Sequence, residues 1–253
     1  MELGLNGRLA VITGASKGIG RAIAERLAAE GANLILVSRS GAALNAIAET
    51  LGSRHGVEVR AMAADLGLSE ERARLVAAVP RIDILVNNAG AIPPGTVSQV
   101  DESAWRSAWD LKVYGTIFLT QALYPSIAAA KGVILNIIGV AAEDYPHDYI
   151  AGAAGNSSLV GFTKALAKTA ADDGARVVGI HPGYTATERR ERILRSRAEG
   201  MWGDAERWRE LDAALPYGRA ATPEEIAAAA AFLVSPLSSY TNGVVLSIDG
   251  GKR

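Results

Sequence analysis

The sequence contains no cysteine, which excludes disulfide bonds, thiolate metal sites and a cysteine nucleophile. It also lacks an excess of charge of either sign, because 26 Lys and Arg residues balance 27 Asp and Glu residues. This balance argues against a general electrostatic attraction to nucleic acids or to anionic membranes. We therefore expect neither partner, and we expect no metal site.

Long hydrophobic runs are absent as well. The longest apolar run, Ile226–Val234, is far shorter than the about 20 residues that a membrane span requires. The N-terminal MELGLNGRLA lacks the basic and apolar regions of a signal peptide. These features predict a cytoplasmic protein. No Pro/Ser/Gly-rich linker and no internal repeat divides the 253 residues, so we predict a single domain.

Short apolar segments recur along the chain, and alanine-rich helical segments separate most of them. Strands that alternate with helices indicate a parallel sheet covered on both faces, which predicts a doubly wound α/β fold. The predicted strands are Leu9–Ile12, Leu34–Val37, Val57–Met62, Ile84–Val86, Val133–Ile138, Val177–Ile180 and Val244–Ile248.

A glycine-rich turn, TGASKGIG from Thr13 to Gly20, follows the first predicted strand. Directly after it, Ile19, Ile23 and Leu27 lie four residues apart, as on one face of a helix. Glycines allow the backbone to approach a ligand, and a helix N-terminus offers unpaired N–H groups and a positive dipole end. The stretch therefore predicts a nucleotide-binding site.

The end of the second strand predicts which dinucleotide binds. An acidic residue there would bind the ribose 2′-hydroxyl of NAD, whereas an Arg would pair with the 2′-phosphate of NADP. No acid lies between Leu34 and Asn45, while Arg39 is present and Lys17 adds a second positive charge. We predict a preference for NADP(H) over NAD(H); the alternative is that both cations are solvated surface residues.

Polar residues also follow the third and fourth strands. Asp65 and Leu66 follow the third, and Asn87-Asn88-Ala89-Gly90 follows the fourth. The C-terminal ends of parallel strands are where such sheets bind ligands. The asparagine pair has a structural alternative, namely satisfying backbone groups where neighbouring strands separate.

Together, TGASKGIG, NNAG, Pro182-Gly183 followed by Thr187, and the closing TPEEIAAAAAFLVSPLSSYTNGVVLSIDGG resemble the short-chain dehydrogenase/reductase family along essentially the full length. The resemblance implies a Rossmann-type fold, a nicotinamide cofactor, hydride transfer between alcohols and carbonyls, and a homo-oligomer, usually a tetramer. It also implies that the cofactor is lined by Gly14, Ser16, Lys17, Ile19, Arg39, Asp65, Leu66, Asn88, Gly90, Pro182, Gly183 and Thr185.

The family's catalytic pattern is where this sequence departs. In the family a Lys lowers the pKa of a Tyr that exchanges a proton, assisted by a Ser and an Asn. Alignment of the surrounding residues puts Gly139 at the Ser position, Gly152 at the Tyr position and Asn156 at the Lys position. All three catalytic groups are then missing, which predicts an atypical active site.

The family's Asn position falls on Lys112, so Lys112 and Asn156 look exchanged. By helical periodicity Lys112 shares an apolar stripe with Trp105, Ala108, Trp109, Gly115 and Leu119. We predict that Lys112 reaches the nicotinamide ribose and that Asn156 completes the network. The alternative is a Lys that extends along its methylene stem to solvent.

Tyr149 is the leading candidate for the proton donor, because it precedes Gly152 by about one helical turn and should face the substrate. The rivals are Tyr145, His147, Asp148 and Tyr184, whereas His181 is interpreted as a strand-end residue.

Residues 187–216 carry equal numbers of arginines and acidic residues, which predicts a solvated helical insert. Its apolar residues, Ile193, Leu194, Met201, Trp202, Trp208 and Leu211, predict a lid over the substrate, although packing explains them equally well. The segment identifies no substrate.

Three functions follow from these observations. The first is an NADP(H)-dependent oxidoreductase that acts on an unidentified alcohol or carbonyl through a rearranged site. The second is a dinucleotide-binding protein with little or no catalysis, serving as a sensor, scaffold or partner subunit. The third is another reaction on the same scaffold, such as a dehydration.

Overall fold

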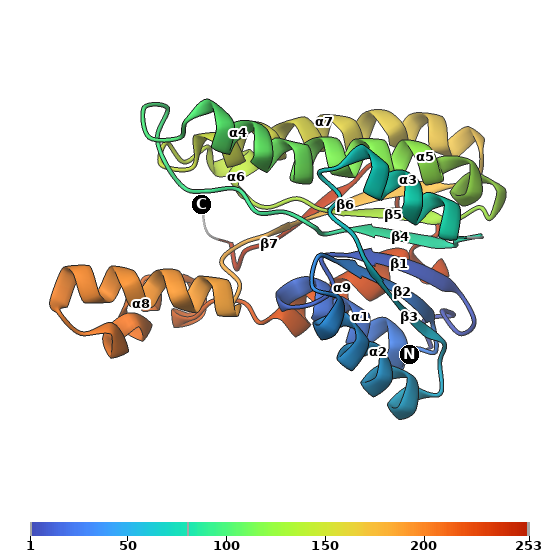
Figure 1. Cartoon of the computed structure of the whole chain (residues 1–253), viewed down its shortest axis with the longest axis horizontal. Helices are drawn as coiled ribbons and strands as arrows, with labels where there is room; N and C mark the ends of the chain where they lie inside the picture. The colour runs from blue at the N-terminus through green and yellow to red at the C-terminus, as the bar shows by residue number, and fades with distance from the viewer. Residues whose placement is uncertain (1, 80, 252–253) are drawn as a thin grey trace.

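The computed structural model describes residues 2–79 and 81–251, which form a seven-stranded parallel sheet between two layers of helices (Figure 1). The strand order is β3-β2-β1-β4-β5-β6-β7. Each apolar segment predicted to be a strand forms one, so the predicted doubly wound α/β fold is confirmed. The strands are β1 Leu9–Thr13, β2 Asn33–Ser38, β3 Val59–Ala63, β4 Ile84–Asn87, β5 Val133–Ile137, β6 Arg176–Pro182 and β7 Val245–Ile248.

Helices cover both faces of the sheet because neighbouring strand residues point to opposite sides. Ile12 belongs to the core under α1 (Gly18–Ala29), α2 (Gly41–His55) and α9 (Pro223–Val234), shown below the sheet in Figure 1. Val11 belongs to the core on the opposite face. That face carries α3 (Ser69–Ala78), α4 (Glu102–Trp109), α5 (Gly115–Ala129) and α7 (Ile150–Asp172), with the short α6 (Ala141–Asp144) nearby.

The segment between β4 and β5 is not the continuous α-helix that the apolar stripe predicted. A π-helical turn, η1 (Asp110–Tyr114), separates α4 from α5 and contains Lys112. Gly115 allows the chain to pass close to the loop after β3, since a Cβ at Gly115 would lie 3.0 Å from the Leu66 carbonyl oxygen. An α-helical period does not predict this wider turn.

An arm projects from the body at the left of Figure 1. It consists of α8 (Glu188–Trp202) and the 3₁₀ helix η2 (Ala205–Asp212), which pack against each other. Thr187 caps α8 by accepting a hydrogen bond from the Arg190 backbone N–H at 3.3 Å. Two short 3₁₀ helices, η3 (Pro216–Gly218) and η4 (Pro236–Ser238), lie near α9 in the sequence.

None of the helices in the described part of the chain combines the length and the apolar character needed to cross a bilayer.

A buried polar network links the centre of the sheet to α5 and α7. The Asn87 side-chain amide donates to Thr120 Oγ1 and to Asn136 Oδ1, both at 2.9 Å. The Asn136 amide in turn donates to Thr163 Oγ1 at 2.9 Å. All four side chains are buried, so each depends on the others for its hydrogen bonds. Asn87 therefore joins buried side chains, whereas the structural role expected for the asparagine pair, satisfying backbone groups where strands separate, falls to Asn88.

Replacement of Asn136 by Ala should lower the free energy of unfolding by about 2–4 kcal/mol, because buried partners lose their hydrogen bonds and a void forms. Urea unfolding followed by circular dichroism measures the change. Asn45→Ala, at an exposed position on α2, is the matched control and should shift stability by no more than about 0.5 kcal/mol. Equal effects of the two substitutions would contradict the importance of the network.

Candidate functional site

A cavity of about 900 Å³ lies at the C-terminal ends of the central strands. It is centred where the chain order reverses between β1 and β4, the usual ligand position in open α/β sheets. Of the residues expected to line the cofactor, those in this cavity are Gly14, Ser16, Lys17, Ile19, Arg39, Leu66, Asn88, Gly90, Pro182, Gly183 and Thr185. Asp65 instead lines an adjoining cavity of about 680 Å³, which Arg39 also borders.

The glycine turn is held in place by Asn88. The Asn88 side-chain amide donates to the carbonyl oxygens of Thr13 at 3.0 Å and Gly14 at 3.2 Å. Gly14 has a φ of 66°, in the left-handed region. A Cβ at Gly20 would lie 2.4 Å from both the Asn88 amide nitrogen and the Gly14 oxygen, so the turn requires glycine there.

The start of α1 is suited to a phosphate. Lys17 occupies the N-cap position, and no side chain caps the helix. The first-turn N–H groups and the positive end of the helix dipole are therefore available to an anion beside the glycine turn. Together with the close backbone approach, this arrangement fits the pyrophosphate of a dinucleotide.

Arg39 lies directly after β2 at one end of the cavity. Its guanidinium is 3.9 Å from the Asp65 carboxylate, and the Arg39 side chain is 69% exposed. Asp65 also accepts a hydrogen bond from the Gly67 backbone N–H at 3.0 Å. Arg39 is thus loosely paired and can turn toward a phosphate in the cavity.

Lys112 points inward. Its ammonium donates to the carbonyl oxygens of Ile137 at 3.1 Å and Ile138 at 2.8 Å, where the chain leaves β5. A Cβ at Gly90 would lie 2.5 Å from the Lys112 Cδ, so glycine makes room for the side chain. Burial, and secondly the positive charge of Arg189, lower the pKa of Lys112 to about 8. The alternative of a Lys that extends to solvent is wrong.

Asn156 lies behind the cavity and does not line it. Its amide donates to the Gly139 carbonyl oxygen at 3.3 Å, and a Cβ at Gly139 would lie 2.9 Å from the amide nitrogen. The Asn156 Oδ1 is buried and has no hydrogen-bond partner among the described residues. Lys112 and Asn156 thus contact the same backbone segment after β5 from two different helical elements.

The Tyr149 ring covers Gly152. Tyr149 is the N-cap residue of α7, with φ −143° and ψ 41°, so it is not helical itself. A Cβ at Gly152 would lie 1.9 Å from Tyr149 Cε1 and 2.3 Å from Cζ, which means that the ring fills the space above Gly152. Tyr149 is half-buried and lines the large cavity. Burial raises the pKa of Tyr149, while the positive charge of Arg189 opposes this shift.

Arg189 was not recognised from the sequence, where it was one of many balanced charges on the insert. Its guanidinium donates to the Ile92 carbonyl oxygen at 2.8 Å, which ties the start of α8 to the loop after β4. Arg189, Lys112 and Tyr149 line the same cavity, and the positive charge of Arg189 acts to lower the pKa of both of the other side chains. No local pattern marks this residue, because the packing of the arm on the cavity brings it there.

Of the other candidate proton donors, only Tyr184 is among the described residues that line the large cavity. Tyr145, His147 and Asp148 are exposed and do not line the large cavity. Tyr184 does line it. His181 is buried within β6, with its Nε2 3.7 Å from a Glu143 carboxylate oxygen, and burial lowers its pKa.

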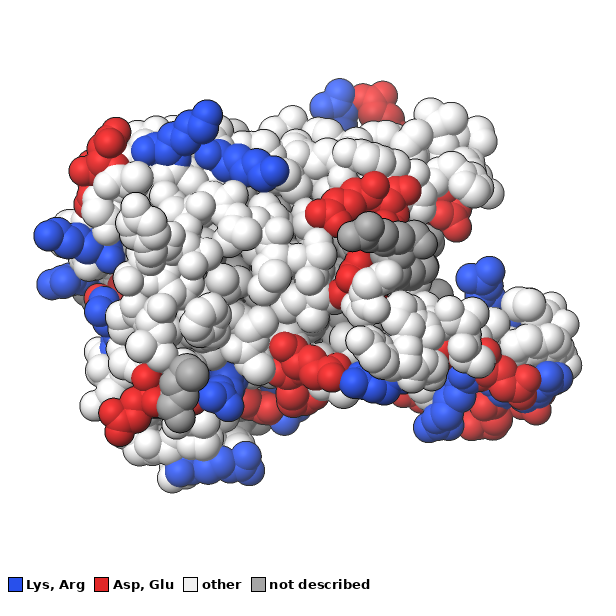
Figure 2. Space-filling view, turned by 180° about the vertical axis from the view of Figure 1, so that it is seen from behind, with Lys and Arg blue, Asp and Glu red and all other residues white. Residues whose placement is uncertain are grey.

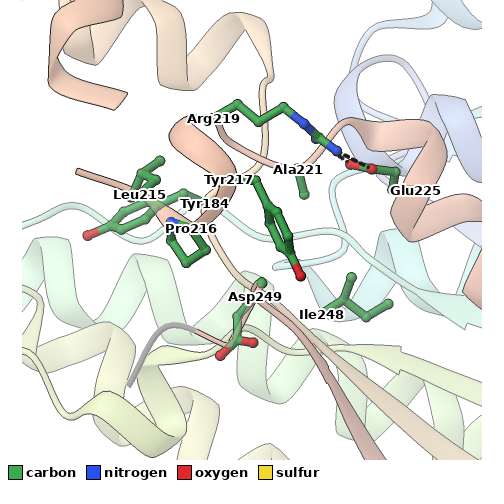
Figure 3. Close-up of a pocket in the computed structure, with 10 residues that line it drawn as sticks. Tyr184, Leu215, Pro216, Tyr217, Arg219, Ala221, Glu225, Ile248 and Asp249 are labelled. Carbon is green, nitrogen blue, oxygen red and sulfur yellow. Dashed lines mark hydrogen bonds and ion pairs between the residues drawn. The ribbon is translucent and has the colours of Figure 1, made fainter. Parts of the chain in front are cut away.

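A smaller cavity of about 180 Å³ also borders Tyr184 (Figure 3). Tyr217 projects into it beside Ile248, and Asp249 lies at its edge. The Arg219 guanidinium is paired with the Glu225 carboxylate through contacts of 2.7 and 2.9 Å. The only cation among its described lining residues is therefore neutralised.

The chain is similar to known proteins over nearly its whole length. A family model described as Enoyl-(Acyl carrier protein) reductase matches residues 14–253. Galactitol 2-dehydrogenase (L-tagatose-forming) from Cereibacter sphaeroides is 35% identical over 250 residues, covering 98% of this chain and 95% of that protein.

Solved structures are similar over the full length. L-sorbose reductase from Gluconobacter frateurii, complexed with NADPH and L-sorbose, superposes with a TM-score of 0.94 at 32% identity and covers 99% of this chain and 98% of its own. A structure described as a short chain dehydrogenase/reductase family protein superposes with a TM-score of 0.85 at 35% identity, with coverages of 99% and 98%.

The side chain of Lys112 should titrate with a midpoint near pH 8, whereas exposed lysines titrate near about 10.4. The shift follows from burial, which disfavours the charged form. NMR of protein labelled with [ε-¹³C]lysine measures each midpoint, and Lys112→Arg identifies the resonance by its loss. A Lys112 midpoint indistinguishable from those of the exposed lysines would contradict the buried position of the ammonium.

Proposed function

Because the chain belongs to the short-chain dehydrogenase/reductase family, we propose that it is an NADP(H)-dependent oxidoreductase acting on an alcohol or carbonyl through a rearranged active site. The observation that carries the proposal is the Tyr149 ring above Gly152, on the wall of the cavity formed by the cofactor motifs. A phenol is thereby present at the site although the aligned position is glycine.

The rearrangement rests on where the aligned positions lie. By the registration of the surrounding residues, Gly139, Gly152 and Asn156 correspond to the family's Ser, Tyr and Lys positions. Tyr149 enters the space above Gly152 from the N-cap of the same helix, and the Asn156 amide abuts Gly139. The volumes of two missing side chains are therefore occupied by groups from neighbouring positions.

Tyr149 is the proposed proton donor. The phenol is protonated at neutral pH, and burial, which raises its pKa, favours this form. In the reductive direction the O–H proton passes to the carbonyl oxygen of the substrate as that oxygen becomes a hydroxyl. The positive charge of Arg189 stabilises the tyrosinate that remains. Bound NADPH supplies the hydride.

Lys112 and Asn156 are proposed to position the backbone and the cofactor for this proton transfer. Both hydrogen-bond the backbone after β5, which carries Gly139 into the cavity wall. Lys112 uses two N–H groups on carbonyl oxygens, and its third is available to a hydroxyl of the nicotinamide ribose. This is the role we propose for it.

The cofactor preference can be tested through Arg39. The wild type should bind NADPH more tightly than NADH, and Arg39→Ala should reduce that preference about tenfold, because a charge-assisted contact to the 2′-phosphate is lost. Titration of the nucleotide fluorescence measures both affinities. Arg54→Ala removes the same charge from an exposed position on α2 and should leave the preference unchanged. An unchanged preference in Arg39→Ala would refute the assignment.

The proton donor can be tested through Tyr149. Tyr149→Phe should lower kcat by about 10²- to 10⁴-fold, with NADPH affinity unchanged, in a spectrophotometric screen of sugars, polyols and oxo acids. Tyr145→Phe removes the same hydroxyl at a position that is 67% exposed and serves as the control.

Equal turnover by Tyr149→Phe and wild type would eliminate Tyr149 as the donor. Tight NADPH binding without turnover of any compound by the wild type would favour the dinucleotide-binding alternative.

A further inference from the structure

The charges of the arm are balanced overall but not on the side that faces the large cavity. Viewed from behind, Lys/Arg and Asp/Glu side chains intermingle along the arm (Figure 2). Of the described residues that line the cavity, the only acidic one is Glu188. The cations that line it are Lys17, Arg39, Lys112, Arg189, Arg190, Arg192 and Arg197.

Some of these cations have other partners. Lys17 and Arg39 lie beside the glycine turn and the end of β2, where the cofactor phosphates would bind. Arg190 forms an ion pair with Asp212 at 2.5 Å, and both side chains are 14% exposed. The remaining cations are Lys112, Arg189 and two exposed arginines of α8, Arg192 and Arg197.

Among the arginines of the cavity, Arg189 has an exposed side chain that a hydrogen bond nevertheless holds in position. Its hydrogen bond to the Ile92 carbonyl oxygen holds the guanidinium against the loop after β4. Within the described ranges, no carboxylate lies within 4.0 Å of that guanidinium to form an ion pair. A guanidinium has five N–H donors, so this contact leaves donors for a planar anion.

We propose that the substrate of this oxidoreductase carries an anionic group, a carboxylate or a phosphate, that binds Arg189 while the carbonyl lies at Tyr149. The inference rests on the proposed function and adds the class of substrate. Arg189 and Tyr149 line the same cavity, which puts the anion site within the reach of a small molecule whose oxygen contacts the phenol.

The smaller cavity, unlike the large one, has no surplus of positive charge among its described lining residues. It contains Glu225 and Asp249, and its Arg219 is already paired with Glu225. The basic character is therefore a property of the large cavity and not of every concave surface on the molecule. A charge surplus confined to the reaction site selects the substrate rather than attracting anions generally.

Binding to the NADP⁺ complex tests the inference without turnover, because NADP⁺ cannot reduce a ketone. Isothermal titration calorimetry would compare 4-oxopentanoate with its methyl ester, acetoacetate with methyl acetoacetate, and dihydroxyacetone phosphate with dihydroxyacetone. In at least one pair the anion should bind about 10- to 100-fold more tightly than its neutral partner. The oxo acid and phosphate pairs distinguish the two kinds of anion.

Variants of Arg189 test whether this residue causes the preference for anionic compounds. Arg189→Gln should abolish the preference for the anion, and Arg189→Lys should retain part of it, because the charge remains without the planar pair of donors. Arg209→Gln removes the same charge from an exposed position on the arm that does not line the cavity, and the preference should persist.

The outcomes separate the two proposals. Failure to bind NADP⁺ would overturn the proposed function and this inference with it. Normal NADP⁺ binding with equal affinities in all three pairs would overturn the anionic substrate alone. A preference that survives in Arg189→Gln would overturn the assignment to Arg189.

Discussion

The interlock between Asn88 and the glycine turn is the constraint on which the rest of the site depends. Thr13 Oγ1 donates to the Val86 carbonyl oxygen at 3.2 Å and accepts from the Asn88 and Ala89 backbone N–H groups at 2.8 and 3.0 Å. The Asn88 amide then closes on the turn itself. These contacts fix the ends of β1 and β4 where the strands diverge, and so fix both the opening of the cavity and the start of α1.

Near Tyr149, two glycines leave space that the side chains of other residues fill. A glycine at 152 admits the Tyr149 ring, and a glycine at 139 admits the Asn156 amide. A side chain at either glycine would collide with the group now present, so the glycines and their occupants form matched sets.

The ammonium of Lys112 and the guanidinium of Arg189, which belongs to the arm, affect each other electrostatically. Burial lowers the pKa of Lys112 to about 8 from 10.5, so the unfolded chain binds more protons between these values. The buried ammonium therefore opposes folding at neutral pH, and the opposition is relieved as the pH rises through this window. Two carbonyl oxygens partly compensate the buried charge. Arg189 adds a further positive charge from the arm, and a bound anion would offset it.

The sequence by itself determined the strands, their parallel sheet and the glycine turn, because these depend on local periodicity and on residues close together in the chain. It also pointed to three candidate residues. Lys112 and Asn156 look exchanged relative to the family pattern, and Tyr149 precedes Gly152 by about one helical turn. Only the tertiary structure decided that the ammonium of Lys112 faces carbonyl oxygens after β5, because those oxygens belong to residues 25 and 26 positions further along the sequence. Likewise, Arg189 meets Ile92 across 97 residues of sequence. Contacts of that range are set by how the arm packs, and no local pattern of charge encodes them.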